Sequence, residues 1–146
     1  MTSYTDFADH PFIDFSCYSD THKAAYGFRP RGDHHMDWLL SLTREQYAAE
    51  LDQMGTLIWA QEEEDITRSE GAYATALSEI DAIARDHRVS FDTACRWWLV
   101  SELDEIALSG DWISHELDHA LWSRGMRYTE AAPFAEMVLG AYRDAS

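Results

Sequence analysis

Apolar residues recur every three or four positions over residues 43–87, the longest periodic stretch in the chain. They are Tyr47, Leu51, Met54, Ile58, Ile66, Tyr73, Leu77, Ile80 and Ala84. This period predicts an amphipathic α-helix with one apolar stripe. Thr43 and Gln46 match a capping box at its start, and no proline interrupts the stretch. An unbroken helix here would be about 66 Å long. Either it projects and pairs as a coiled coil, or it breaks near Glu70–Gly71. We favour one long helix with at most a kink.

Shorter helices are predicted on both sides of this stretch. Their predicted limits are Ser19 to Gly27, Ser90 to Gly110, Asp111 to Gly125, and Thr129 to about Asp144. Serine, threonine and aspartate favour the start of a helix, and glycine suits the left-handed residue that ends one. No stretch alternates as a β-strand does. The sequence predicts an all-α fold and a single domain over 1–146. Residues 1–42 would form a loop and short-helix extension packed on 43–146.

Charge changes this picture most. The 146 residues include 11 basic and 27 acidic side chains, a net charge of −16. Direct binding to nucleic-acid phosphates and attachment to an anionic membrane both need the opposite balance, so we expect neither. Residues 43–87 alone carry three basic and eleven acidic residues, half of the excess. The run Glu62, Glu63, Glu64 and Asp65 is expected on the solvent side of the helix, with Glu70 close by.

One motif, His115-Glu116-Leu117-Asp118-His119, matches the H-E-x-x-H pattern of zinc hydrolases. On a helix the two histidines share a face and could bind zinc, with Glu116 as the general base. The further ligands of such enzymes and the edge strand that holds a substrate are missing from the pattern. We therefore favour a solvent-facing histidine pair on an amphipathic helix buried through Ile113, Leu117, Ala120 and Leu121. A small zinc metallohydrolase remains the weaker alternative.

A second motif lies in residues 83–97. It resembles a helix-turn-helix of the repressor kind, with the pattern A-x-x-x-G-V-S-x-x-T-V/A-x-R. The matching residues are Ala84, Val89, Ser90, Thr93, Ala94 and Arg96. Arg88 stands where the turn glycine is expected. The flanking residues Glu102, Asp104 and Glu105 are acidic, whereas a DNA-binding helix is usually surrounded by cations. The preferred interpretation is a pair of helices joined by a Ser-capped turn, with Trp97, Trp98 and Leu99 in the core. A DNA-binding regulator is an alternative.

A third motif covers residues 18–31, which read Y-x-D-x-x-K-x-x-Y-G-F-R-P-R. This stretch resembles a group of small tailed-phage proteins of unassigned function. The resemblance implies a phage or prophage origin and action in the cytoplasm of an infected cell, and it carries over no catalytic residues. Within the stretch, Lys23, Arg29 and Arg31 form a cationic island. The island could bind an anionic group of a partner, but pairing with the acidic long helix is favoured.

Other candidate chemistry is sparse. Asp33, His34 and His35, with His22 and His10, could form a loose metal cluster, but adjacent histidines in a polar loop are more often solvated, and no metal is assigned. Cys17 and Cys95 lack any metal or disulfide spacing, which is typical of a reducing cytoplasm. The first twelve residues lack the features of a signal peptide, so a cytoplasmic protein is expected.

These observations favour a non-enzymatic protein without a cofactor. Its acidic face, Glu62 to Asp65 and Glu70, would imitate the phosphates of nucleic acid. Such a face would bind the basic groove of a host nucleic-acid-handling or defence protein, of the restriction or CRISPR type, and inhibit it. The apolar stripe also predicts a weak homodimer. Short helices are expected to cover most of the stripe, and repulsion between the acidic runs limits pairing.

Overall fold

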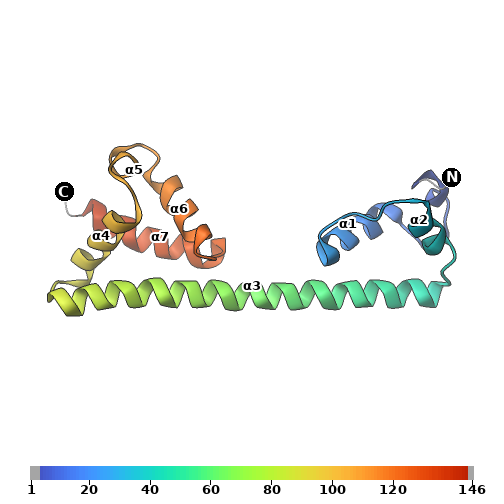
Figure 1. The fold of residues 1–146 in the computed structure, drawn as a ribbon, viewed down its shortest axis with the longest axis horizontal. Helices are drawn as coiled ribbons and strands as arrows, with labels where there is room; N and C mark the ends of the chain where they lie inside the picture. Colours follow the sequence, from blue (N-terminus) through green and yellow to red (C-terminus); the bar gives the residue numbers. More distant parts are fainter. Residues whose placement is uncertain (1–3, 145–146) are drawn as a thin grey trace. The chain divides into compact units, whose positions relative to one another are not determined.

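A computed structural model describes residues 4–144 and places most of them in helices. Over these residues the elements are a 3₁₀ helix, η1, and seven α-helices, with no β-strand. Their bounds are η1 Tyr4–Phe7, α1 Phe15–Tyr26, α2 Asp33–Leu40, α3 Arg44–His87, α4 Phe91–Glu102, α5 Glu105–Ser109, α6 Ile113–Ser123 and α7 Tyr128–Arg143. The predicted all-α fold is confirmed (Figure 1).

The long helix predicted from the periodic stretch is confirmed as α3, a single run of 44 residues. It starts at the predicted capping box. The Gln46 amide N–H donates to Thr43 Oγ1 at 3.1 Å, and the Thr43 amide donates to Gln46 Oε1 at 2.9 Å. The helix does not break at Glu70–Gly71. Reciprocal capping at its start satisfies two amide donors that would otherwise lack partners.

Contacts divide the chain into two compact units, residues 1–63 and 64–146. Unit 1 contains η1, α1, α2 and the first part of α3. Its core includes Phe7, Ile13, Tyr18 and Leu39, closed by Tyr47 and Met54 of α3. The sequence-based boundary after residue 42 differs from this division because the start of α3 completes the core of the first unit.

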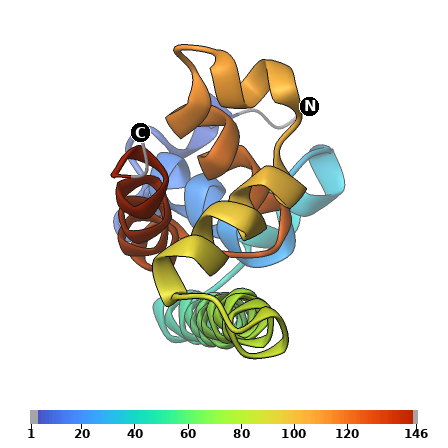
Figure 2. The ribbon, with the colours of Figure 1, turned by 90° about the vertical axis from the view of Figure 1, so that its left-hand side faces the viewer.

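Unit 2 contains the rest of α3 and helices α4 to α7. Ala76 and Ile80 of α3 share a buried core with Trp98 of α4, Leu121 of α6 and Phe134 of α7. Helix α7 packs against α4 and α6 (Figure 2). The rings of Trp98 and Phe134 meet edge to face at 5.3 Å, an arrangement that aromatic side chains favour.

The apolar stripe of α3 is covered within each unit. Met54 and Ile80 are fully buried, and Leu51, Ile58 and Leu77 are half-buried. Short helices therefore cover most of this stripe, as expected from the sequence. Homodimerisation stays a prediction. No helix of residues 4–144 is both long and apolar enough to cross a membrane.

Several helix limits differ from the predictions. Helix α1 ends at Gly27 as predicted, and Gly27 adopts the left-handed region at φ 88°. Its N-cap is Asp14 and not Ser19: the Asp14 carboxylate accepts the Cys17 amide. Ser19 is a buried residue inside the helix. The helix predicted from Ser90 to Gly110 is two helices. Asp104 accepts the Ala107 amide and starts α5 as a new N-cap.

Candidate functional site

The five acidic residues predicted to bind a partner all lie exposed on α3. Successive residues of an α-helix are rotated by about 100°, so Glu62, Glu63, Glu64 and Asp65 point around the helix axis rather than to one side. Asp65 is moreover paired with Arg68, Nη1 to Oδ1 at 3.1 Å. The predicted residues are thus solvent-facing, as expected, but the run of four does not make one flat face.

A row of carboxylates does share one side of α3 within unit 1. Glu45, Asp52 and Glu63 are 7 and 11 positions apart, and both spacings return to within about 20° of the same direction. All three are exposed. Within residues 4–144 none of the three has an ion-pair partner. We call them the unit 1 acidic row. Sequence reasoning missed Glu45 and Asp52, although their helical spacing was readable once the helix was predicted.

Unit 2 carries a similar pair on its own part of α3. Glu70 and Asp81 are 11 positions apart and both exposed, and in the part of the chain that is described neither has an ion-pair partner. Glu79, by contrast, points into this unit and pairs with Arg124. Glu70 and Asp81 are therefore available to a cationic partner, whereas Glu79 contributes to the packing of unit 2.

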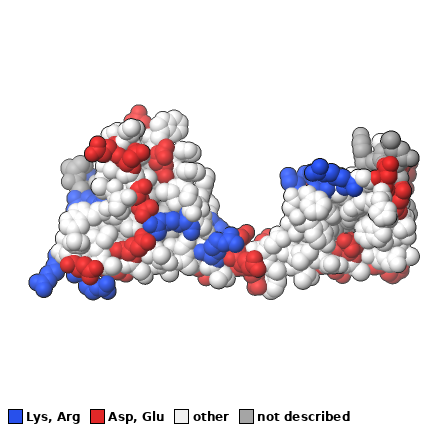
Figure 3. Space-filling model, in the orientation of Figure 1, with Lys and Arg blue, Asp and Glu red and all other residues white. Residues whose placement is uncertain are grey.

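The cationic island lies in unit 1, where Lys23, Arg29 and Arg31 are all exposed. Figure 3 shows blue side chains near the C-terminal end of α1. Arg29 pairs with Asp20 of α1 at 2.6 Å and also donates to Ser19 Oγ at 3.1 Å. The expectation that the island pairs with the long helix is therefore wrong for Arg29, because a carboxylate nine positions earlier in the chain is closer.

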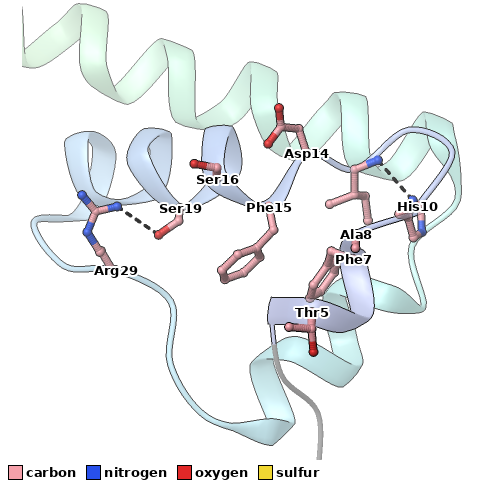
Figure 4. Close-up of a pocket in the computed structure, with 10 residues that line it drawn as sticks. Thr5, Phe7, Ala8, His10, Asp14, Phe15, Ser16, Ser19 and Arg29 are labelled. Carbon is pink, nitrogen blue, oxygen red and sulfur yellow. Dashed lines mark hydrogen bonds between the residues drawn. The ribbon is translucent and has the colours of Figure 1, made fainter.

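A cavity of about 710 Å³ opens beside Arg29 in unit 1. Its lining includes Phe7, Ile13, Phe15, Ser16 and Ser19 (Figure 4). The rings of Phe7 and Phe15 stack at 5.0 Å. The volume lies in the range of small-molecule sites, about 300–1,000 Å³.

Four polar residues of this lining, His10, Asp14, Ser19 and Arg29, make hydrogen bonds within the fold. His10 Nδ1 accepts the amides of Phe12 and Ile13, at 3.3 and 3.1 Å. Asp14 caps α1, and Arg29 is held by Ser19 and Asp20. These hydrogen bonds hold the polar side of the lining in place.

The histidines proposed as a loose metal cluster have a structural role in unit 1. His35 lies on α2, not in a polar loop as expected, and its Nε2 is hydrogen-bonded to the Tyr18 hydroxyl at 2.9 Å. His22 is buried and its Nδ1 lies 2.7 Å from the Phe28 carbonyl oxygen. Burial, then repulsion from His22 and His34, lowers the pKa of His35. Over residues 4–144 no three His, Cys, Asp or Glu side chains gather as metal ligands would.

The H-E-x-x-H motif lies on α6 in unit 2. His115 and His119 are exposed on one face, while Leu117 and Leu121 are fully buried and Ile113 and Ala120 are half-buried. This is the solvent-facing pair that the sequence favoured. Glu116 is exposed in the first turn of α6.

The helix-turn-helix motif is formed by the end of α3 and by α4. Arg88 adopts φ 53°, the left-handed geometry that the matching pattern assigns to glycine. Ser90 caps α4 as predicted, accepting the Thr93 amide. Arg96 is half-buried and its Nη2 donates to Thr93 Oγ1 at 2.9 Å. Trp98 and Leu99 are core residues as expected, but Trp97 is exposed and lies against the His87 ring.

Compared with protein-family models, curated proteins and solved structures, the chain shows no significant match to any of them. Its function is therefore inferred from its own residues.

Proposed function

We propose that the chain is a non-enzymatic binding protein whose α3 carboxylates occupy the basic, nucleic-acid-binding groove of a partner protein. The single observation that supports this most is the unit 1 acidic row, three exposed carboxylates on one helix side that lack internal cations. A groove built to hold phosphates presents lysines and arginines, and such cations attract a carboxylate row over long distances.

Charge density sets how strongly this surface could compete with DNA. Helix α3 has eleven acidic residues among 44, one for about every 6 Å of helix axis. A DNA duplex carries one phosphate charge for about every 1.7 Å. This surface should therefore bind such a groove more weakly than duplex DNA of the same length does, and salt should weaken its binding by screening the carboxylates.

The resemblance to small tailed-phage proteins gives this activity a biological setting. The partner would be a nucleic-acid-handling or defence protein of an infected bacterium, of the restriction or CRISPR type, and occupation of its groove would inhibit it. Lys23 and Arg31 would add a weaker, cationic contact in unit 1.

The experiment is a pull-down from bacterial lysate with the immobilised chain, at low and high salt. Captured proteins are then eluted with duplex DNA and identified by mass. We expect a nucleic-acid-binding protein that duplex DNA releases and that the triple variant Glu45→Gln, Asp52→Asn, Glu63→Gln does not capture.

The matched control removes three exposed carboxylates outside α3, by Asp92→Asn, Glu136→Gln and Asp144→Asn. It changes net charge by the same amount and should retain the partner. Equal capture by both triple variants, or a captured protein that duplex DNA does not release, would overturn the proposal.

A further inference from the structure

Two large apolar side chains stand out from unit 2 where α5 meets α6. Ile106 is 83% exposed and Trp112 is 72% exposed. With Ala107 and Gly110 they line a groove of about 260 Å³. This volume is below the range of about 300–1,000 Å³ typical of small-molecule sites, and it suits the entry of one large side chain.

Carboxylates surround this groove. Asp104 and Glu116 belong to its lining, and the exposed Glu105 and Asp111 are their neighbours in sequence. Within residues 4–144 none of these four has an ion-pair partner. Between Arg96 and Arg124 the sequence has six acidic residues and no lysine or arginine. On the face drawn in Figure 3, the α5 end of unit 2 shows Asp and Glu but no Lys or Arg.

We propose that this acidic–aromatic groove, lined by Asp104, Ile106, Ala107, Gly110, Trp112 and Glu116, binds a cationic amphipathic segment of a partner protein. A leucine-sized or aromatic side chain of the segment enters between Ile106 and Trp112. Lysines or arginines on either side of it pair with Asp104 and Glu116.

Charge complementarity selects this occupant. A purely apolar partner would remove the lining carboxylates Asp104 and Glu116 from water without supplying a cation, which is costly. A second copy of the chain would bring its own −16 net charge against the same rim. A cationic segment satisfies the carboxylates, and its ammonium or guanidinium groups also gain from the face of Trp112. Exposed tryptophans of this kind dominate the binding energy of many interfaces.

This inference goes beyond the proposed function, because it concerns residues 104–116 and not α3. Variants can test the groove and the unit 1 acidic row independently. Substitutions in the groove leave the unit 1 acidic row intact, and the triple variant of that row leaves the groove intact.

The test is fluorescence anisotropy with a labelled helical peptide of about twelve residues, lysines on one face and leucines on the other. A second peptide has alanine in place of every leucine. We expect the leucine peptide to bind at least ten-fold more tightly than the alanine peptide. Trp112→Ala should weaken binding of the leucine peptide at least ten-fold, whereas Trp59→Ala, which truncates an exposed tryptophan of unit 1, should leave it unchanged.

A charge variant distinguishes the contribution of ion pairs with the peptide from that of apolar contacts. Asp104→Asn with Glu116→Gln removes two carboxylates but keeps the α5 cap, because asparagine is as good an N-cap as aspartate. It should weaken binding of the leucine peptide and flatten its dependence on salt. Equal affinity for the two peptides, or unchanged binding by Trp112→Ala with its circular dichroism intact, would overturn the proposal.

Discussion

Arg124, at the end of α6, lies 3.0 Å from the carboxylate of Glu79 on α3. The same guanidinium pairs with Glu102 of α4 and lies 5.1 Å from the ring centre of Trp98. Trp98 Nε1 in turn donates to Glu79 Oε2 at 2.8 Å. Burial raises the pKa of Glu79, but hydrogen bonds from Trp98 and Arg124 outweigh it and the pKa falls below its usual value. One arginine thus joins three helices of unit 2.

Arg124→Ala is expected to destabilise the protein by about 1–3 kcal/mol, because two half-buried carboxylates lose their cation. Urea unfolding followed by tryptophan fluorescence measures this change. The matched control is Arg85→Ala, which removes a solvent-exposed pair with Asp86 and should cost at most about 0.5 kcal/mol. Equal effects of the two substitutions would show that the Arg124 contacts contribute no more than a surface pair does.

Local signals in the sequence were sufficient to predict some features of the fold and insufficient to predict others. The Thr43–Gln46 capping box and the helix end at Gly27 depend on neighbouring residues only, and both were predicted. Helix α2, with its eight residues, was missed because it carries two adjacent histidines and is too short to show a period. Its half-buried His35 is positioned by Tyr18, which lies 17 positions earlier and on another helix.

The same distinction applies to the candidate surfaces. The unit 1 acidic row follows from helix periodicity, so it could have been found in the sequence alone. The acidic–aromatic groove depends on the break at Leu103 that separates α4 from α5, and neither glycine nor proline marks that break. The only local signal there is Asp104 followed by Glu105, which is a typical helix start.

The two cysteines are expected to differ in reactivity. Cys17 is exposed, whereas Cys95 is fully buried. Burial, then the charges of Asp92 and Asp81, raises the pKa of the Cys95 thiol to about 11. The reactive species is the thiolate. A maleimide at neutral pH should therefore modify one thiol in the folded protein and two in urea, as counted by mass spectrometry. Cys17→Ser should abolish the reaction of the folded protein, and rapid modification of Cys95 would contradict its burial.

Arg88→Gly is expected to stabilise the protein. A residue with a side chain in the left-handed region costs about 1–2 kcal/mol, and glycine avoids most of that cost. Glycine also loses more backbone entropy on folding, so a net gain of about 0.5–1 kcal/mol is expected. Thermal unfolding should show a rise of a few degrees in Tm.

The reverse substitution at a second left-handed position provides the control for Arg88. Gly125 has φ 100°, and a Cβ there would lie 3.2 Å from Cγ and Cδ of Arg68. Gly125→Ala should therefore lower Tm. A lower Tm for Arg88→Gly would mean that the Arg88 side chain contributes more than its backbone strain costs.

Stability of unit 1 is expected to fall as the pH drops below about 6.5, the usual pKa of histidine. His35 Nε2 is hydrogen-bonded to the Tyr18 hydroxyl, and the pKa of His35 in the folded protein is lowered by burial, then by His22 and His34. Between the folded pKa and the unfolded one, the unfolded chain binds more protons, so acidification favours unfolding in that window. Above the unfolded pKa, His35 does not make the free energy of unfolding depend on pH. Urea midpoints measured from pH 7.5 to 5.5 should decrease in the wild type and decrease less in His35→Gln. His119→Gln, at an exposed position of α6 in unit 2, should keep the wild-type slope. A wild-type midpoint that stays constant over this range would contradict a linkage through His35.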